Sequence, residues 1–195
     1  MALEWARTLH GYADDPAAAL QQVDRAVVLA PGLHGARFER ALLHLKLGRP
    51  QEALDGLDAL LATGMRHPEL LHVHRARAYE GMAAFSDALG AWQMAIRSAR
   101  PSAWLHWQHA RVAWRMGRLR DAAEALNQAA SVAAEDKEAP DPELLLDLAE
   151  VEWALGATAR ARRALEQAAA ALWPEEVELL ARHDLLEARL AAPEP

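Results

Sequence analysis

The segment Gly48-Arg49-Pro50-Gln51-Glu52-Ala53-Leu54 decides the fold, because it recurs along the chain. Copies read Gly-Arg-Leu-Arg-Asp-Ala-Ala at 117–123 and Gly-Ala-Thr-Ala-Arg-Ala-Arg at 156–162. A copy without the glycine occupies 83–89, and a further degenerate copy ends at Ala19. The five alanines at 19, 53, 88, 122 and 161 are separated by 34, 35, 34 and 39 residues. A nearly constant period of this length predicts that one structural unit is repeated along the chain.

The residues within each period predict two helices joined by a tight turn. Alanine, the best helix former, is very frequent, and no run alternates as a strand would. The glycine that opens the recurring segment suits a helix end, and the alanine lets two helices approach closely. Each first helix carries its own small residue, and each second helix carries a bulky residue four positions after the recurring alanine. The small residues of the first helices are Ala41, Ala76, Ala110 and Ala149. The bulky residues of the second helices are Val23, Leu57, Trp92, Leu126 and Leu165.

The pattern therefore predicts an all-α protein built of helix pairs. The expected first helices are 2–12, 35–47, 69–82, 103–116 and 143–155. The expected second helices are 16–29, 51–62, 86–98, 119–133 and 159–172. A last helix at 175–190, with apolar Val177, Leu180, Leu186 and Leu190, is expected to cap the stack.

The period and these landmarks resemble the tetratricopeptide repeat (TPR) family. The resemblance implies one α-solenoid domain over 1–195, with about five repeats and a capping helix at 175–190. The repeats would be 1–33, 34–67, 68–101, 102–137 and 141–174. The chain departs from the family where the usual tryptophan is replaced by Arg37, His72, His106 and Leu145. The link around 135–142 is also five residues longer than the others.

Composition excludes several kinds of function. The chain has no cysteine, which excludes disulfides and thiolate catalysis. Its net charge of −7 argues against general nucleic-acid binding, which needs a basic footprint. Without a signal-like N-terminus or an apolar run of membrane length, the sequence predicts a cytoplasmic protein that does not bind membranes. The arginine-rich, lysine-poor composition fits GC-rich codon usage and suggests a bacterial source.

The resemblance implies that partners lie in a concave groove lined by the first helices. Trp104, Trp107, Arg111 and Trp114 share one helix face, and Trp and Arg are enriched at binding hot spots. These tryptophans could instead pack inside a tight superhelix. The expected groove residues are Phe38, Leu42, Val73, His74, Arg77, Trp104, Trp107, Gln108, Arg111, Trp114, Arg115, Glu150 and Trp153.

The sequence thus predicts an interaction scaffold that binds another protein or peptide with acidic and apolar residues. A chaperone-tail clamp is not expected, because Phe38 and Leu42 stand where that clamp needs Lys and Asn. The alternative is a self-assembling structural unit that forms homo-oligomers. A metal-dependent enzyme is the weakest alternative, because no carboxylate obviously completes a site with His72, His74, His106 and His109. No catalytic or phosphate-binding motif is present, so no enzyme activity and no cofactor are expected.

Overall fold

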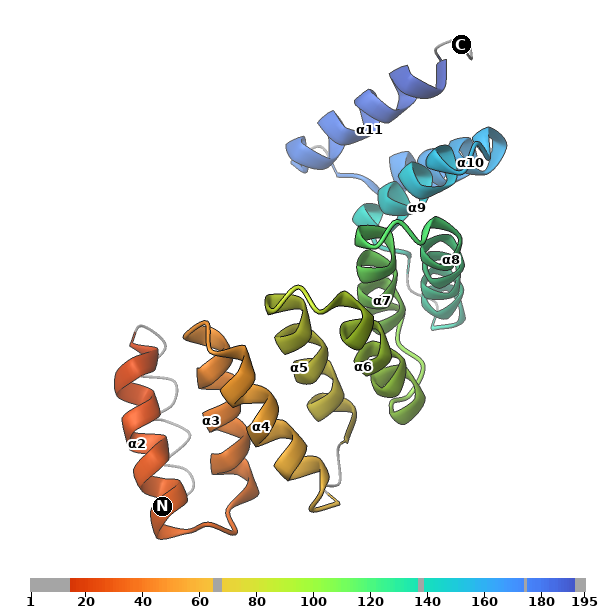
Figure 1. Cartoon of the computed structure of the whole chain (residues 1–195). Helices are drawn as coiled ribbons and strands as arrows, with labels where there is room; N and C mark the ends of the chain where they lie inside the picture. Colours follow the sequence, from red (N-terminus) through yellow and green to blue (C-terminus); the bar gives the residue numbers. More distant parts are fainter. Residues whose placement is uncertain (1–14, 65–67, 137–138, 174, 192–195) are drawn as a thin grey trace. The chain divides into compact units, whose positions relative to one another are not determined.

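The computed structural model describes residues 15–64, 68–136, 139–173 and 175–191, which contain helices and turns but no strand. The predicted helices within these residues are confirmed, and their ends agree within two residues. The expected helix 2–12 lies outside the described residues. The helices are α2 (Pro16–Leu29), α3 (His34–Lys46), α4 (Pro50–Leu61), α5 (Pro68–Gly81), α6 (Phe85–Ser98), α7 (Ala103–Arg115), α8 (Leu119–Glu135), α9 (Pro142–Ala154), α10 (Thr158–Ala171) and α11 (Val177–Ala191) (Figure 1).

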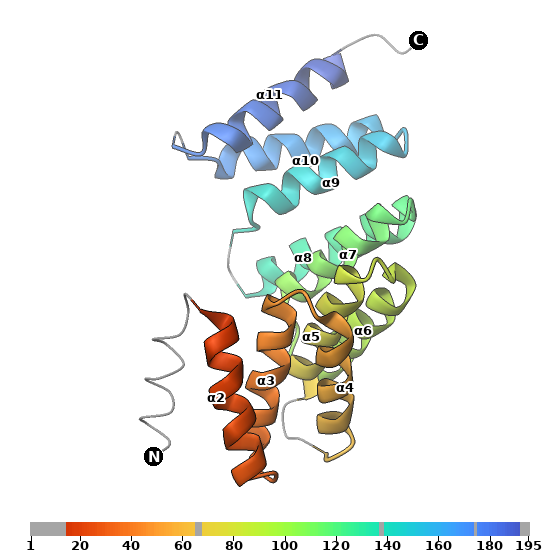
Figure 2. The same cartoon turned by 60° about the vertical axis from the view of Figure 1, so that its left-hand side comes forward.

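The chain divides into two compact units, Met1–Ser98 and Ala99–Pro195. In the first unit, α3 pairs with α4 and α5 with α6, while α2 packs on α3 and α4 on α5. In the second unit, α7 pairs with α8 and α9 with α10, and α8 also packs on α9. The last helix, α11, lies along the α9–α10 pair (Figure 2). Both units are therefore stacked helix pairs, as the repeat predicts.

The recurring glycine ends the first helix of a pair in the left-handed conformation. Gly117 has φ +72°, and its N–H donates to the Trp114 carbonyl at 2.8 Å. The next N–H, of Arg118, donates to the Ala113 carbonyl at 2.9 Å. The two bonds form a Schellman motif, which satisfies carbonyls at the end of α7. The same pair of bonds closes α3 at Gly48 and α9 at Gly156, so the recurring segment works as a helix stop.

One copy of this turn has an alanine in place of the glycine. Ala83 has φ +56°, and the N–H groups of Ala83 and Ala84 bond the Glu80 and Tyr79 carbonyls as in the other copies. A Cβ atom in this conformation costs roughly 1–2 kcal/mol. We expect Ala83→Gly to raise the free energy of unfolding by about 0.5–1 kcal/mol, after the larger entropy of unfolded glycine is subtracted. Urea denaturation followed by circular dichroism measures this change. The matched change Gly117→Ala should act in the opposite direction, and a loss of stability in Ala83→Gly would contradict the account.

The core of both units is built from the repeated small and bulky residues. All five recurring alanines are buried, as are the small residues of the described first helices. The bulky position of each second helix is also buried, and Trp92 is its largest member. Helices can approach closely at the small residues: a Cβ added at Gly56 of α4 would lie 3.5 Å from the Ala41 Cβ of α3. In the last helix, α11, Leu186 and Leu190 are buried, whereas Val177 at its start is exposed.

Candidate functional site

In the first unit, four predicted groove residues lie on neighbouring first helices. The rings of Phe38 on α3 and His74 on α5 meet edge to face, with centroids 5.3 Å apart. Leu42, His74 and Arg77 line a hollow of about 450 Å³. Val73 is an exception that corrects the sequence prediction: its side chain is buried, so it packs in the core rather than facing a partner.

The charge on this surface comes from Arg77 and Lys46, since His74 is neutral at physiological pH. Burial and, second, the charge of Arg77 lower the pKa of His74 to about 4. Arg77 itself is exposed. The surface therefore presents two cations, Arg77 and Lys46, beside the uncharged rings of Phe38 and His74.

The other three candidate histidines, His72, His106 and His109, are buried or half-buried. Burial lowers the pKa of His72, His106 and His109, which favours the neutral ring. Among the described residues, the one group of three potential metal ligands that lie close together is His183, Asp184 and Glu187 on α11. His72, His74, His106 and His109 do not belong to that group.

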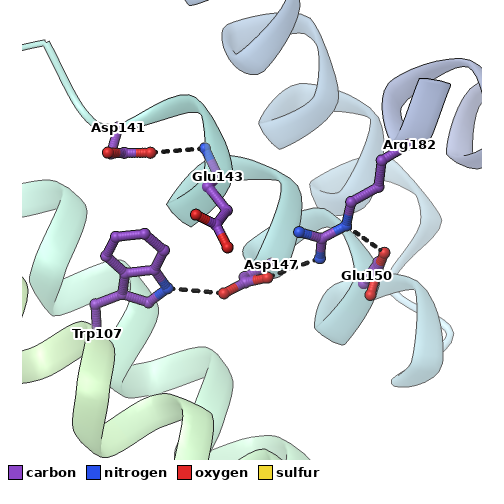
Figure 3. A network of polar contacts seen from close by, with 6 residues as sticks. All are labelled: Trp107, Asp141, Glu143, Asp147, Glu150 and Arg182. Atoms are coloured by element: carbon purple, nitrogen blue, oxygen red, sulfur yellow. Dashed lines mark hydrogen bonds and ion pairs between the residues drawn. The ribbon is translucent and has the colours of Figure 1, made fainter. Parts of the chain in front are cut away.

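In the second unit, a polar network joins three helices (Figure 3). The indole Nε1–H of Trp107 on α7 donates to Asp147 Oδ2 on α9 at 2.7 Å. Arg182 on α11 donates through Nη2 to Asp147 Oδ1 at 2.7 Å and through Nε to Glu150 Oε1 at 2.8 Å. Asp147 is only 5% exposed, so its charge is removed from water and needs these partners.

The network holds Arg182 as a cation and Trp107 in one orientation. Burial opposes the charge of Arg182, but its hydrogen bonds to Glu150 and Asp147 raise its pKa above the ordinary value. Because Asp147 accepts from both Trp107 and Arg182, it links α7 to α11 through α9. The predicted groove residues Trp107 and Glu150 are therefore engaged within the unit, and their orientations are set by it.

The remaining predicted residues of this unit lie on α7 and α9. Arg111 is exposed, and its guanidinium carbon lies 6.0 Å from the centroid of the Trp107 ring. Gln108 and Trp114 are half-buried, and Arg115 is exposed. Trp153 is exposed on α9, with Arg189 of α11 over its ring at 5.4 Å. Thus α11 contributes Arg182 and Arg189 to the region where the sequence predicted only α7 and α9.

A second feature of this unit is a hollow of about 780 Å³, here called the edge pocket. It lies where α7 and α9 begin and where α8 and α10 end. Three tryptophans line it: Trp104, which is 39% exposed, Trp107, and Trp173, which is 69% exposed. The full lining is Ala103, Trp104, Trp107, Ala133, Ala139, Pro140, Asp141, Pro142, Leu144, Ala170, Ala171, Leu172, Trp173 and Glu176.

The tetratricopeptide repeat family model matches residues 8–68 and 108–177. The chain belongs to the tetratricopeptide repeat family. A relative from Xanthomonas axonopodis pv. citri, named cellulose synthase operon protein C, is 31% identical over an alignment of 162 residues, and the match covers 76% of this chain. This TPR chain spans about a tenth of that protein's length, because the match covers 10% of it.

Solved TPR structures share the fold. A TPR protein of Thermus thermophilus is 23% identical with a TM-score of 0.60, and the match covers 93% of this chain and 94% of that one. YrrB, described as a TPR protein with an unusual peptide-binding site, is 16% identical with a TM-score of 0.68, covering 89% and 86%. Within the described part of this TPR chain, no helix has the length and apolar character needed to cross a membrane.

Sequence reasoning missed Asp147, Arg182 and Trp173 in this TPR unit. A signal for Asp147 was present, because it interrupts the apolar run Leu144–Leu148, where an unpaired carboxylate would be costly. Trp173 stands just before Pro174, outside the predicted helices, where the repeat pattern assigns no function. Arg182 has no comparable signal, since arginine is common on exposed helix faces.

Proposed function

We propose that this chain is a protein-interaction module that holds a segment of a partner protein against its first helices. Tetratricopeptide repeats are generally protein-interaction domains. In the second unit α7 is the main contact, with Arg111, Trp114 and Arg115 facing the partner. In the first unit the hollow beside Leu42, His74 and Arg77 is a further contact.

The observation that carries this proposal is the state of Arg111. Its guanidinium is exposed, and among the described residues of its own unit it forms no ion pair. Glu150, an acid on the neighbouring first helix α9, is bonded to Arg182. An arginine above an aromatic ring can still donate in a fork to a carboxylate. This arrangement suits an acidic side chain or a C-terminal carboxylate of a partner.

Preorganisation supports the same function. Trp107, which carries Arg111 on its ring, is held by the hydrogen bond to Asp147. A binding residue whose support is already ordered loses less conformational entropy when a partner arrives. YrrB, which has the same fold at 16% identity, is described as having a peptide-binding site, which agrees with a binding role for this fold.

We expect Arg111→Glu to reduce capture of the partner at least about tenfold, because a charge-assisted pair is replaced by repulsion. The urea midpoint should change little, since exposed substitutions usually alter stability by less than about 0.5 kcal/mol. The unchanged chain and the Arg111→Glu chain are each immobilised, and the amounts of the proteins that co-purify with them are compared by mass spectrometry.

Arg163→Glu is the matched control, because Arg163 is exposed on α10, away from α7. It should leave capture unchanged. Full capture by a stable Arg111→Glu protein would contradict the proposal. Light scattering tests the alternative of self-assembly. If the molecular mass of the unchanged chain in solution rises with concentration, and the mass of Arg111→Glu is lower, the partner is a second copy of the chain.

A further inference from the structure

The edge pocket lies where the chain departs from its own period. The recurring alanines Ala122 and Ala161 are 39 residues apart, whereas the other spacings are 34 or 35 residues. Part of the excess lies in α8, which has 17 residues, whereas α6 and α10 have 14, and the link that follows α8 lines the pocket through Ala139, Pro140 and Asp141. The end of α8 and this link therefore form one wall of a hollow that lies between two successive repeats.

Aromatic rings dominate the lining of this pocket. Trp104 and Trp107 are one helical turn apart at the start of α7, and Trp173 follows the end of α10. Trp173 is 69% exposed, a high value for the largest apolar side chain. Its backbone N–H donates to Glu176 Oε2 at 2.8 Å, so this carboxylate lies beside the tryptophan. An indole and a carboxylate that line one pocket both attract a cation, the indole through its quadrupole and the carboxylate through its charge.

All formal charge in the described lining is negative. Asp141 and Glu176 are the charged residues that line the pocket, and no described lysine or arginine lines it. Asp141 uses Oδ1 to cap α9 by accepting from the Glu143 N–H at 2.8 Å, which holds the carboxylate at the pocket (Figure 3). The wider surroundings have the same sign, since residues 131–195 carry 15 acidic and 6 basic groups.

We infer that the edge pocket binds a cationic side chain, the guanidinium of an arginine, from a basic segment of a protein partner. The tryptophan faces would contact the guanidinium plane, while Asp141 and Glu176 would accept its N–H groups. Arginine suits this pocket better than lysine, because its flat, weakly hydrated group stacks on aromatic rings and donates in a fork. The carboxylates of Asp141 and Glu176 would repel an anionic ligand. A purely apolar ligand would remove water from these carboxylates without giving them a hydrogen-bond donor or an opposite charge.

This inference goes beyond the proposed function, and the two concern opposite charges. Arg111 on the exposed face of α7 suits an acidic group, whereas the edge pocket suits a basic one. Trp107 borders both, because Arg111 lies over its ring and its side chain also lines the pocket. One partner segment with an acidic and a basic residue could engage both places.

The test uses two blocked hexapeptides, Ala-Ala-Arg-Arg-Ala-Ala and the same peptide with citrulline in place of arginine. Citrulline has nearly the same shape as arginine but no charge. Each is titrated into the full chain labelled with ¹⁵N, and the indole N–H signals of Trp104, Trp107 and Trp173 are followed by NMR. We expect the arginine peptide to shift these signals saturably and to bind at least about fivefold more tightly than the citrulline peptide.

Variants place the binding at the edge pocket. Trp173→Ala and Glu176→Gln should each weaken binding of the arginine peptide about three- to tenfold. Trp173 is exposed, and glutamine can still accept from the Trp173 N–H, so neither change should unfold the unit. Leu185→Ala and Glu178→Gln are the controls, because both residues are exposed on α11 and neither lines the pocket, so both should bind normally.

Three results would overturn the inference: equal binding of the two peptides, no shift of the three indole signals, or a loss of binding in Leu185→Ala that Trp173→Ala does not show. Arg111→Glu should bind the arginine peptide at least as well as the unchanged chain does. The edge pocket and the groove proposal can therefore fail independently.

Discussion

Asp147→Ala is expected to lower the free energy of unfolding of the second unit by about 3 kcal/mol. Removal of one partner from a buried ion pair typically costs about 3–5 kcal/mol, because the other charge stays behind without compensation. The lower end applies here, since Arg182 keeps its hydrogen bond to Glu150. The Trp107 indole N–H also loses its acceptor, which adds to the cost. Urea denaturation followed by circular dichroism measures the loss.

Two further variants separate the causes of this loss. Asp147→Asn keeps an oxygen that can accept from Trp107 but removes the charge, so it should cost less than Asp147→Ala. Asp184→Ala removes an aspartate whose side chain is 79% exposed on α11, and it should change stability by less than about 0.5 kcal/mol. If Asp147→Ala were as stable as Asp184→Ala, the network would not hold α7, α9 and α11 together.

Ala41→Trp is expected to destabilise the first unit by at least about 3 kcal/mol, the upper end of the usual cost of overpacking. Ala41 is 1% exposed on α3, and it lies where α4 approaches most closely, next to Gly56. It also belongs to a core cluster with Leu57, Leu60 and Leu71, which leaves no space for an indole ring. The same urea denaturation experiment measures the effect.

The control at this crossing is Gly56→Ala. The added methyl would be 3.5 Å from the Ala41 Cβ, an ordinary contact, and alanine favours a helix over glycine by about 1 kcal/mol. Gly56→Ala should therefore be neutral or stabilising. Ala17→Trp, at an exposed position of α2, should have little effect. An unchanged urea midpoint in Ala41→Trp would show that the helices do not cross at this residue.

The helices themselves could be predicted from the sequence with good accuracy. Their ends follow from local chemistry: Asp15 and Asp141 cap α2 and α9, and Gly48, Gly117 and Gly156 end α3, α7 and α9. These signals act over four or five residues, so they are visible without any knowledge of the tertiary structure. The alanine at position 83 was recognised as a degenerate copy, but its left-handed conformation could be seen only in the structure.

The candidate site was less predictable. The spacing of Trp104, Trp107, Arg111 and Trp114 placed them on one helix, and helical geometry alone justified that step. Spacing could not show that Trp107 bonds Asp147, which is 40 positions further along the chain. Nor could it show that Val73 is buried while its neighbour His74 borders a hollow.

The repeat pattern alone was sufficient to predict an all-α protein of paired helices, because the period, the small residues and the helix stops are local properties of the chain. The partners of the long polar side chains depended on packing instead. On its own helix Arg182 could have faced water. Because α11 packs against α9, Arg182 instead donates to the buried carboxylate of Asp147. The shape of the edge pocket also depends on packing. The extra residues between Ala122 and Ala161 border a pocket only once α7, α8, α9 and α10 are packed together.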